Sequence, residues 1–329
     1  MTHLTPSRLD LARRDTPIQA LERLPAALGL EGVLHVKRDD LTGCGLSGNK
    51  IRKLEYLLAE ARQQGADTVI TCGGIQSNHC RATAVAAARL GLRARLVLRG
   101  AAPPREALAG NLLLDHLVGA ELRWITRERY SEARGAVMED EAERVRRRGG
   151  RPYIIPEGGS SGLGSRAYVD VIDELAAVSD GEPYDAIAVA VGSGGTLAGL
   201  AAGAALRPEV ARSVIGFPVC DSSAVFRARV TELLTELEAR CGLAVGDAAF
   251  ELCDRWKGVG YALSTPAERG FIALAARTEG LLLDPVYTGK ALRGLTEEWR
   301  AGRFGASPRL LFIHTGGLFG ALASAWPEL

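Results

Sequence analysis

Lysine is scarce in this 329-residue sequence, and its few positions indicate where amine chemistry is available. The chain has 40 lysines and arginines, yet lysine occurs only at positions 37, 50, 53, 257 and 290. Arginine can replace lysine at solvated positions, but it cannot form an imine or release a proton near neutral pH. A lysine retained in such an arginine-rich chain is therefore a candidate functional residue.

Lys50 is the foremost candidate because of what surrounds it. It follows the turn and cap sequence LSGN at 46–49 and precedes a stripe of apolar residues with helical spacing. We therefore expect Lys50 at the N-terminus of a helix over 51–64. The helix dipole, with Arg52 and Lys53 nearby, disfavours the ammonium form there. A lysine in this position suits Schiff-base chemistry. The alternative interpretation is that Lys50 is a solvated lysine in a first helical turn with no catalytic role.

Two glycine-containing turns are candidate anion sites. In 71–79 (TCGGIQSNH), backbone N–H groups, the Ser77 hydroxyl and the Asn78 amide form a carboxylate or phosphate site, or else simply cap the next helix. His79 is a candidate proton carrier or hydrogen-bonding residue. The segment 191–196 (VGSGGT) has the form of a phosphate cradle, or of a tight turn that needs small residues. It lacks the Lys-Ser/Thr of a Walker loop, which argues against triphosphate hydrolysis.

Apolar runs that alternate with helical patterns predict a parallel α/β fold around these turns. We find no internal repeat, and we predict a small domain over 53–152 and a large domain over 1–52 and 153–329. The expected strands are 33–37, 68–72, 95–98, 121–125, 153–155, 186–191, 213–218 and 309–313. The expected helices are 51–64, 79–90, 110–117, 131–148, 163–178, 196–205, 223–240, 266–279, 289–301 and 317–326.

Composition narrows the class of protein. The net charge is +1, whereas a nucleic-acid or anionic-membrane binder shows a basic stripe. The uncharged run 186–206 contains five glycines and is expected to form a buried strand, a loop and a helix rather than a membrane span. The six cysteines show no zinc spacing, and we expect no metal site. With no signal peptide evident, we expect a cytoplasmic protein with reduced thiols.

Taken together, these motifs resemble the pyridoxal-phosphate enzymes of the tryptophan-synthase-β fold, called fold type II. The match is closer to the D-cysteine desulfhydrases and 1-aminocyclopropane-1-carboxylate deaminases. Most of the chain takes part, in the order typical of that family. The segments that carry the resemblance are VKRDDLTGCGLSGNKIRKLEYLLAEA, TCGGIQSNHCRATAVAAA, GNLLLDHLVGA, IIPEGGSSGLG, VGSGGT, LDPVYTGKAL and FIHTGG.

The resemblance implies a fold and a set of site residues. The fold is two open, twisted, mostly parallel sheets with helices on both faces, with the cofactor pyridoxal 5'-phosphate in the cleft between the two domains. Lys50 resembles the lysine that holds the cofactor as an internal aldimine. The implied cofactor contacts are Lys50, Lys53, Asn78, Ser193, Gly194, Gly195, Thr196, Thr288 and Thr315. The implied substrate contacts are Ser77, Asn78 and His79, and the implied catalytic residues are Lys50, Ser77, Tyr261 and Tyr287.

Thr288 and Thr315 separate the subgroups of this family. The cyclopropane deaminases typically carry Glu and Leu at these positions, so the pair here resembles the desulfhydrases. A threonine hydroxyl promotes protonation of the cofactor ring less than a carboxylate, which favours β-elimination over ring opening. We therefore predict a lyase that converts D-cysteine to pyruvate, hydrogen sulfide and ammonia. The alternatives are the deaminase, which forms 2-oxobutyrate and ammonia, and a lyase acting on another β-substituted amino acid.

Other functional classes stay open at this point. A biosynthetic β-replacement enzyme fits the same motifs. A nicotinamide oxidoreductase would require G-x-G-x-x-G and a following acidic residue, and we do not find that pair. A non-catalytic protein that binds a small ligand would have the same phosphate loop but would not convert any amino-acid substrate. The expected partner is a small amino-acid substrate, and the resemblance implies a homodimer.

Overall fold

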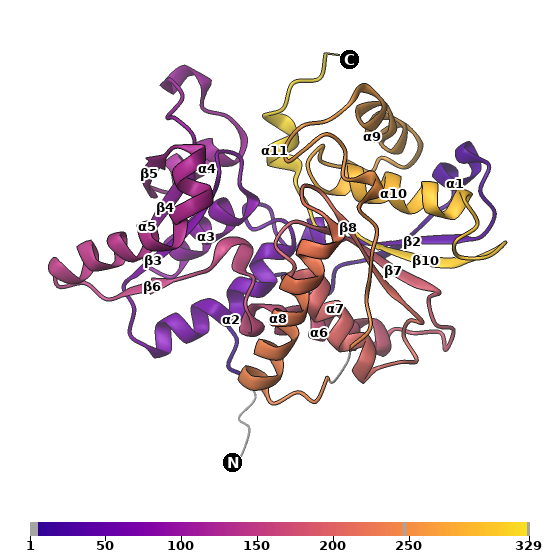
Figure 1. The fold of residues 1–329 in the computed structure, drawn as a ribbon, viewed down its shortest axis with the longest axis horizontal. Coiled ribbons are helices and arrows are strands. Elements are labelled where there is room, and N and C mark those ends of the chain that lie inside the picture. Colours follow the sequence, from indigo (N-terminus) through magenta and orange to yellow (C-terminus); the bar gives the residue numbers. More distant parts are fainter. Residues whose placement is uncertain (1–5, 246–247, 328–329) are drawn as a thin grey trace.

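The computed structural model describes residues 6–245 and 248–327 and shows two lobes, each built on its own sheet (Figure 1). The larger sheet has six strands in the order β1-β2-β10-β7-β8-β9, and the smaller has four in the order β5-β4-β3-β6. Within the described residues only β1 runs antiparallel, along β2; every other pairing in the two sheets is parallel. The predicted fold class is therefore confirmed.

All expected strands are present, with ends that differ by at most two residues. The short strands β1 and β9 were not predicted, because four and two residues at a sheet edge carry little pattern. The larger sheet contains β1 (Ile18–Leu21), β2 (Val33–Lys37), β10 (Arg309–Ile313), β7 (Ala186–Val191), β8 (Val214–Pro218) and β9 (Glu251–Leu252). The smaller sheet contains β5 (Glu121–Ile125), β4 (Arg93–Arg99), β3 (Thr68–Gly74) and β6 (Pro152–Ile154).

The helices follow the predicted pattern, with three differences. The helix α1 was not predicted, and α5 begins four residues early because Thr126 caps it. The last helix is shorter than expected, since the Ser324 and Trp326 side chains donate to its carbonyls and the chain turns away. The helices are α1 (Arg23–Leu28), α2 (Asn49–Gln63), α3 (Asn78–Arg89), α4 (Gly110–Leu117), α5 (Arg127–Arg147), α6 (Gly162–Ala177), α7 (Gly195–Leu206), α8 (Ser223–Cys241), α9 (Pro266–Glu279), α10 (Thr288–Arg300) and α11 (Leu318–Leu322).

Strand β7 shows how the large sheet is buried on both faces. Its six residues are all buried, and they alternate between two apolar clusters. Ile187, Val189 and Val191 pack with α6, α7 and α8, whereas the alternate alanines pack with α9 and α10. The run 186–206 is thus strand, loop and helix, as predicted. Among the described residues, no helix has the length and apolar character needed to cross a membrane.

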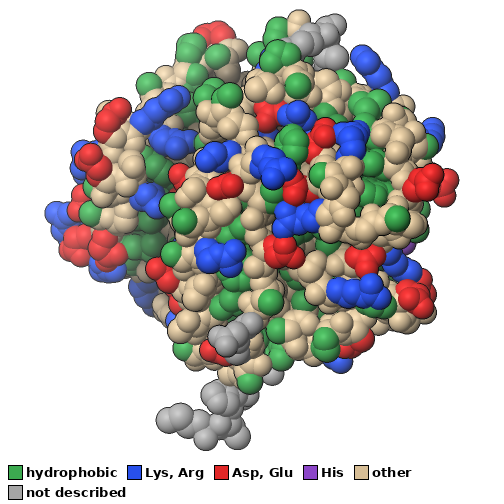
Figure 2. Space-filling model, turned by 45° about the vertical axis from the view of Figure 1, so that its right-hand side comes forward, with side chains coloured by type: hydrophobic (Ala, Val, Ile, Leu, Met, Phe, Trp, Pro, Cys, Tyr) green, Lys and Arg blue, Asp and Glu red, His purple; other side chains and the backbone are tan. Residues whose placement is uncertain are grey.

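The small sheet is covered in the same way. One face packs against α5, and the other joins the main cluster with α2 and α3. The predicted domain boundaries fall inside elements: 52/53 lies within α2 and 152/153 within β6. The division into these two domains stays a prediction. The face of the molecule in Figure 2 intersperses acidic and basic side chains, with no stripe of one sign.

Candidate active site

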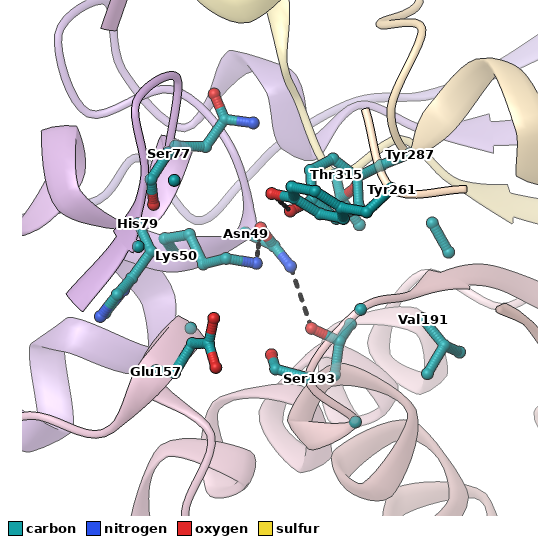
Figure 3. A pocket seen from close by; sticks show the side chains of 18 of the residues that line it. Asn49, Lys50, Ser77, His79, Glu157, Val191, Ser193, Tyr261, Tyr287 and Thr315 are labelled. Atoms are coloured by element: carbon teal, nitrogen blue, oxygen red, sulfur yellow. Dashed lines mark hydrogen bonds between the residues drawn. The ribbon is translucent and has the colours of Figure 1, made fainter. Parts of the chain in front are cut away.

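One pocket lies where the carboxyl ends of strands from both sheets meet, the usual ligand position in α/β folds. Its walls come from the start of α2, the turns after β3 and β7, and two C-terminal segments (Figure 3). The predicted site residues that line it are Lys50, Ser77, Asn78, His79, Ser193, Gly194, Thr196, Tyr261, Tyr287 and Thr315.

Lys50 occupies the centre of this pocket. Its Nζ donates to Asn49 Oδ1 at 3.1 Å, and Asn49 Nδ2 donates in turn to Thr196 Oγ1 at 3.0 Å. In Figure 3 the amine lies between Ser77 and His79 on one side and the two tyrosines on the other. Burial lowers the pKa of Lys50 from 10.5 to about 8, and the nearby charge of Asp284 opposes that shift. The amine can therefore lose its proton close to neutral pH.

The cause of this low pKa differs from the sequence prediction. Arg52 is not responsible, because its guanidinium is fully buried and bonds to Asp39 and Glu174 at 2.8 and 2.7 Å. The cation that acts on Lys50 is Arg81, which lies far away in the sequence. Burial, a property of the folded chain, is the largest effect.

The turn after β3 provides side-chain donors. Ser77 caps α3: its Oγ accepts a hydrogen bond from Cys80 N at 3.1 Å, and the residue also lines the pocket. The His79 ring is buried and bonds Thr71 Oγ1 through Nε2 at 2.8 Å. Since Thr71 donates its proton to Ile155 O, Nε2 is the donor to Thr71. Burial, with Lys50 and Lys53, holds the pKa of His79 well below 6.5, so the ring is neutral.

The turn after β7 forms an anion cradle at the N-terminus of α7. This helix begins at Gly195, and the residues on either side of its start, Gly194 and Thr196, line the pocket, so the positive end of its dipole lies there. Gly195 N donates to Ser160 Oγ at 3.2 Å. Lys53 Nζ donates to Ser160 Oγ at 3.2 Å, and Ser160 Oγ lies 2.7 Å from Ser193 Oγ. A Cβ on Gly195 would lie 2.7 Å from Ser160 Oγ and 2.9 Å from Lys53 Nζ. Only glycine leaves this cradle open.

Two neutral phenols face Lys50 from the large lobe. Tyr261 Oη and Tyr287 Oη lie 2.7 Å apart, and the rings meet edge to face. Burial raises the pKa of both tyrosines, so each keeps its proton at neutral pH. The backbone before Tyr287 is ordered by Asp284, whose Oδ2 accepts from Val286 N and Tyr287 N at 2.9 Å each.

The two subgroup threonines lie in different environments. Thr315 lines the pocket and is 8% exposed. Thr288 is fully buried and does not line the pocket. Its Oγ1 donates to Asp284 Oδ1 at 2.7 Å and accepts from Asp284 N at 2.8 Å. Thr288 therefore supports the Asp284 turn, and among the two only Thr315 presents its side chain to the pocket.

Sequence reasoning missed four residues of this site. Asn49 links Lys50 to α7, Ser160 is the centre of the cradle, and Asp284 orders the tyrosine turn. Glu157 lines the pocket and accepts from Tyr130 Oη at 2.6 Å. Asp284 alone had a local signal, since an aspartate before Pro-x-Tyr-Thr suits a side chain that bonds the following backbone. The described residues contain no cluster of His, Cys, Asp or Glu suited to a metal.

These donors fit a ligand that bears both a phosphate and an aldehyde. An uncapped helix N-terminus, hydroxyl groups and a buried lysine amine match a phosphate dianion. Lys50, with its low pKa, matches the carbonyl carbon. Pyridoxal phosphate has both groups, and the residues of this pocket therefore suit the cofactor that the motifs imply.

Comparison with known proteins gives a consistent result. Residues 9–316 match the family described as pyridoxal-phosphate dependent enzyme. The chain is 42% identical to the bifunctional D-cysteine desulfhydrase/1-aminocyclopropane-1-carboxylate deaminase, mitochondrial, of Arabidopsis thaliana, over 97% of this chain and 81% of that protein. It is 40% identical to the D-cysteine desulfhydrase of Yersinia enterocolitica, over 94% of this chain and 93% of the relative. A crystal structure of an ACC deaminase homologue superposes with a TM-score of 0.87 at 41% identity, over 96% and 93% of the two chains.

Proposed function

Because the chain belongs to the pyridoxal-phosphate-dependent enzymes, we propose that it is a lyase that removes the β-substituent of an amino acid, with D-cysteine as the preferred substrate. The reaction converts D-cysteine and water to pyruvate, hydrogen sulfide and ammonia. The carbon–sulfur bond breaks, the α-proton is lost, and water replaces nitrogen at the α-carbon. When bound, the cofactor supplies an electron sink for the pair released from the α-carbon.

The cradle and Lys50 together would hold the cofactor. The phosphate would be bound by the N-terminus of α7, with Ser193, Thr196 and the amine of Lys53 beside it. Lys50 Nζ would attach to the aldehyde carbon and, once substrate replaces it, take the proton from the substrate α-carbon. A pKa of about 8 suits a base that must be both free and strong near neutral pH.

The substrate would lie between the two faces of the pocket. The Ser77 hydroxyl and the Asn78 amide would bind its carboxylate, with His79 packed behind them as a neutral ring. The phenol pair would then face the leaving group, where Tyr261 or Tyr287 donates a proton from Oη to the departing thiolate. The observation that carries this proposal is the placement of a low-pKa lysine amine opposite two protonated phenols in one pocket.

The second candidate is 1-aminocyclopropane-1-carboxylate deamination, which opens a carbon ring and gives 2-oxobutyrate and ammonia. The similarity to the bifunctional Arabidopsis protein, whose name includes this activity, supports the deaminase as a second candidate. Ring opening demands a stronger electron sink than loss of a thiolate. Thr315 gives the pocket an uncharged hydroxyl, which supports the desulfhydrase as the main activity.

The first experiment measures products from both substrates with the pyridoxal-phosphate-loaded protein. We expect equimolar pyruvate and sulfide from D-cysteine, at a higher kcat/KM than 2-oxobutyrate from the cyclopropane substrate. A Lys50→Ala control should show neither product. A larger kcat/KM for the cyclopropane substrate would reverse the preference, and absence of both products would direct the search to other β-substituted amino acids.

Two single substitutions test the role given to the threonines. Thr315→Leu should raise the ratio of cyclopropane to D-cysteine kcat/KM by about tenfold, because Thr315 is the one of the two threonines that lines the pocket. Thr288→Ser serves as the matched control, because it keeps the hydroxyl that bonds Asp284. An unchanged ratio in Thr315→Leu would contradict the subgroup argument.

The family resemblance also leads us to propose a cytoplasmic homodimer. The six cysteines in the described residues are all unpaired, which agrees with a reducing compartment. Light scattering coupled to size-exclusion chromatography tests the oligomer: a mass near twice 34.9 kDa supports a dimer, and a mass near 34.9 kDa contradicts it.

A further inference from the structure

The first turn of α4 is attached to the turn that carries Ser77 and Asn78. Asn111 N donates to Gln76 Oε1 at 2.9 Å, and Gln76 Nε2 donates to Ala109 O at 3.0 Å. Asn111 is fully buried and bonds with its side chain as well. Its Nδ2 lies 3.0 Å from Gln76 O and 3.0 Å from Asn78 Oδ1. Asn111 therefore contacts Asn78 directly while lying behind the pocket wall.

The orientation of these two amides follows from the groups that can only donate or only accept. Arg81 Nε lies 3.1 Å from the Asn111 side chain, and a guanidinium only donates, so the atom that faces it is the Asn111 oxygen. The other end of the Asn111 amide faces a backbone carbonyl, Gln76 O, and so must be nitrogen. The second hydrogen on that nitrogen is directed to Asn78, whose facing atom must accept it.

Arg81 cannot turn away from this arrangement. It is 1% exposed, and its other nitrogens donate to Gly45 O and Ser47 O at 2.8 Å each. Both carbonyls belong to the turn that precedes Lys50. Burial lowers the pKa of Arg81 to about 10, which still leaves it charged at neutral pH. The series of hydrogen bonds therefore has one direction: the fixed Arg81 cation donates to Asn111, and Asn111 donates to Asn78.

We propose that Asn111 is a positioning residue that fixes the Asn78 amide with its NH2 group toward the pocket. Asn78 Oδ1 is occupied by Asn111, and Asn78 Nδ2 has no partner among the described residues. The pocket therefore receives a donor at this position, which suits an anionic oxygen of the bound cofactor or substrate. A flipped amide would present an oxygen there and repel the same atom. This inference rests on the proposed function, because it requires the cofactor in this pocket.

The test uses Asn111→Asp, which keeps the acceptor for Arg81 and removes the donor for Asn78. The Asn78 amide should then turn its NH2 toward the new carboxylate and its oxygen toward the pocket. We expect pyridoxal phosphate to bind about tenfold more weakly, the effect of one lost hydrogen bond to a charged group. The pH midpoint of the visible absorption of the bound cofactor should also move by about one unit.

A double-mutant cycle separates positioning from general damage. When Asn78 is already alanine, Asn111→Asp should change the cofactor affinity by less than about twofold and the pH midpoint of the absorption by less than about 0.3 unit. Changes of this size are expected even when two sites act independently. Asp115→Asn is the matched control: it alters a fully buried side chain one turn further along α4, near Arg81, and should leave the spectrum unchanged. If Asn111→Asp fails to fold, Asn111→Ala carries the test with an expected threefold loss.

The outcomes are distinct. An Asn111→Asp protein that folds and keeps the wild-type affinity and absorption overturns the inference, and so does an effect that persists undiminished on the Asn78→Ala background. Wild-type protein that develops no visible band with pyridoxal phosphate would instead contradict the proposed function, because that band does not depend on Asn111.

Discussion

The helices α3 and α7 both begin at the pocket, and their N-termini differ in how they are capped. The first turn of α3 is closed by its own Ser77 side chain, whereas α7 starts after Gly194 with no side-chain cap. A capped terminus has satisfied one of its free N–H groups within the chain, so it contributes to the pocket through the Ser77 and Asn78 side chains. At α7 the cap residue Gly194 has no side chain, and Gly195 N donates instead to Ser160 Oγ at 3.2 Å. Ser160 and the buried Lys53 amine lie beside this terminus, which suits it to an external anion. We propose that the difference separates a substrate side of the pocket from a phosphate side.

The amine between the two termini gives the largest expected effect. At pH 7 a pKa of about 8 leaves about one tenth of Lys50 uncharged, some 300-fold more than the ordinary value of 10.5. Cofactor-free protein should therefore be trapped at Lys50 by pyridoxal and cyanoborohydride, at a rate that increases with pH and levels off above about 8. Peptide mass spectrometry measures the rate, with Lys257 as the internal reference. A rate at Lys50 that still increases above pH 10 would contradict the low pKa.

A single added methyl group at Gly195 should block the anion cradle on the proposed phosphate side of the pocket. Gly195→Ala places a Cβ 2.7 Å from Ser160 Oγ in the cradle, so we expect about 100-fold weaker binding of pyridoxal phosphate, the loss of two hydrogen bonds to a charged group. Inorganic phosphate should raise the melting temperature of the wild type and not of this variant. Gly270→Ala in α9 meets nothing within 4 Å and should bind normally, with a gain of about 1 kcal/mol in stability.

The substrate side should respond more mildly. Ser77→Ala removes the cap of α3 and the pocket hydroxyl, so we expect a loss of about 1 kcal/mol in stability and about a tenfold increase in KM. Cofactor affinity should be nearly unchanged. Ser222→Ala removes the cap of α8 outside the pocket, and it should cost similar stability with no change in KM. Equal KM values for the two variants would mean that Ser77 acts only as a cap.

The sequence predicted what depends on local pattern and missed what depends on distant contacts. Lys50, Ser77 and the 191–196 turn, which the structure brings to one pocket, could be predicted because each stands at the start of a helix after a recognisable turn. Ser160 could not be predicted in this way, because its role arises where a loop meets α2 and α7. Thr288 illustrates the same limit, since its hydroxyl bonds Asp284 and not the pocket.

The lysines show where a composition argument holds. Lys50 and Lys53 lie at the pocket and its cradle, but two other rare lysines are buried for structural reasons. Lys290 Nζ donates to Lys257 O and Gly260 O at 2.9 and 2.8 Å, which holds the loop before Tyr261. Lys37 Nζ donates to Thr16 O at 2.7 Å. Rarity therefore identified two lysines at the pocket and its cradle, together with two buried lysines that bond backbone carbonyls.

The pairing of β2 with β10 has a consequence for the order in which the protein is made. Lys50 follows β2, near the start of the chain, whereas Thr315 follows β10, near its end. Asn49 N donates to Thr315 O at 3.1 Å, so the start of α2 is completed by a residue that is synthesised more than 260 positions later, after β10. A nascent chain can assemble the small sheet before β10 is made, but the start of α2 gains its partner at Thr315 only after β10 has been synthesised.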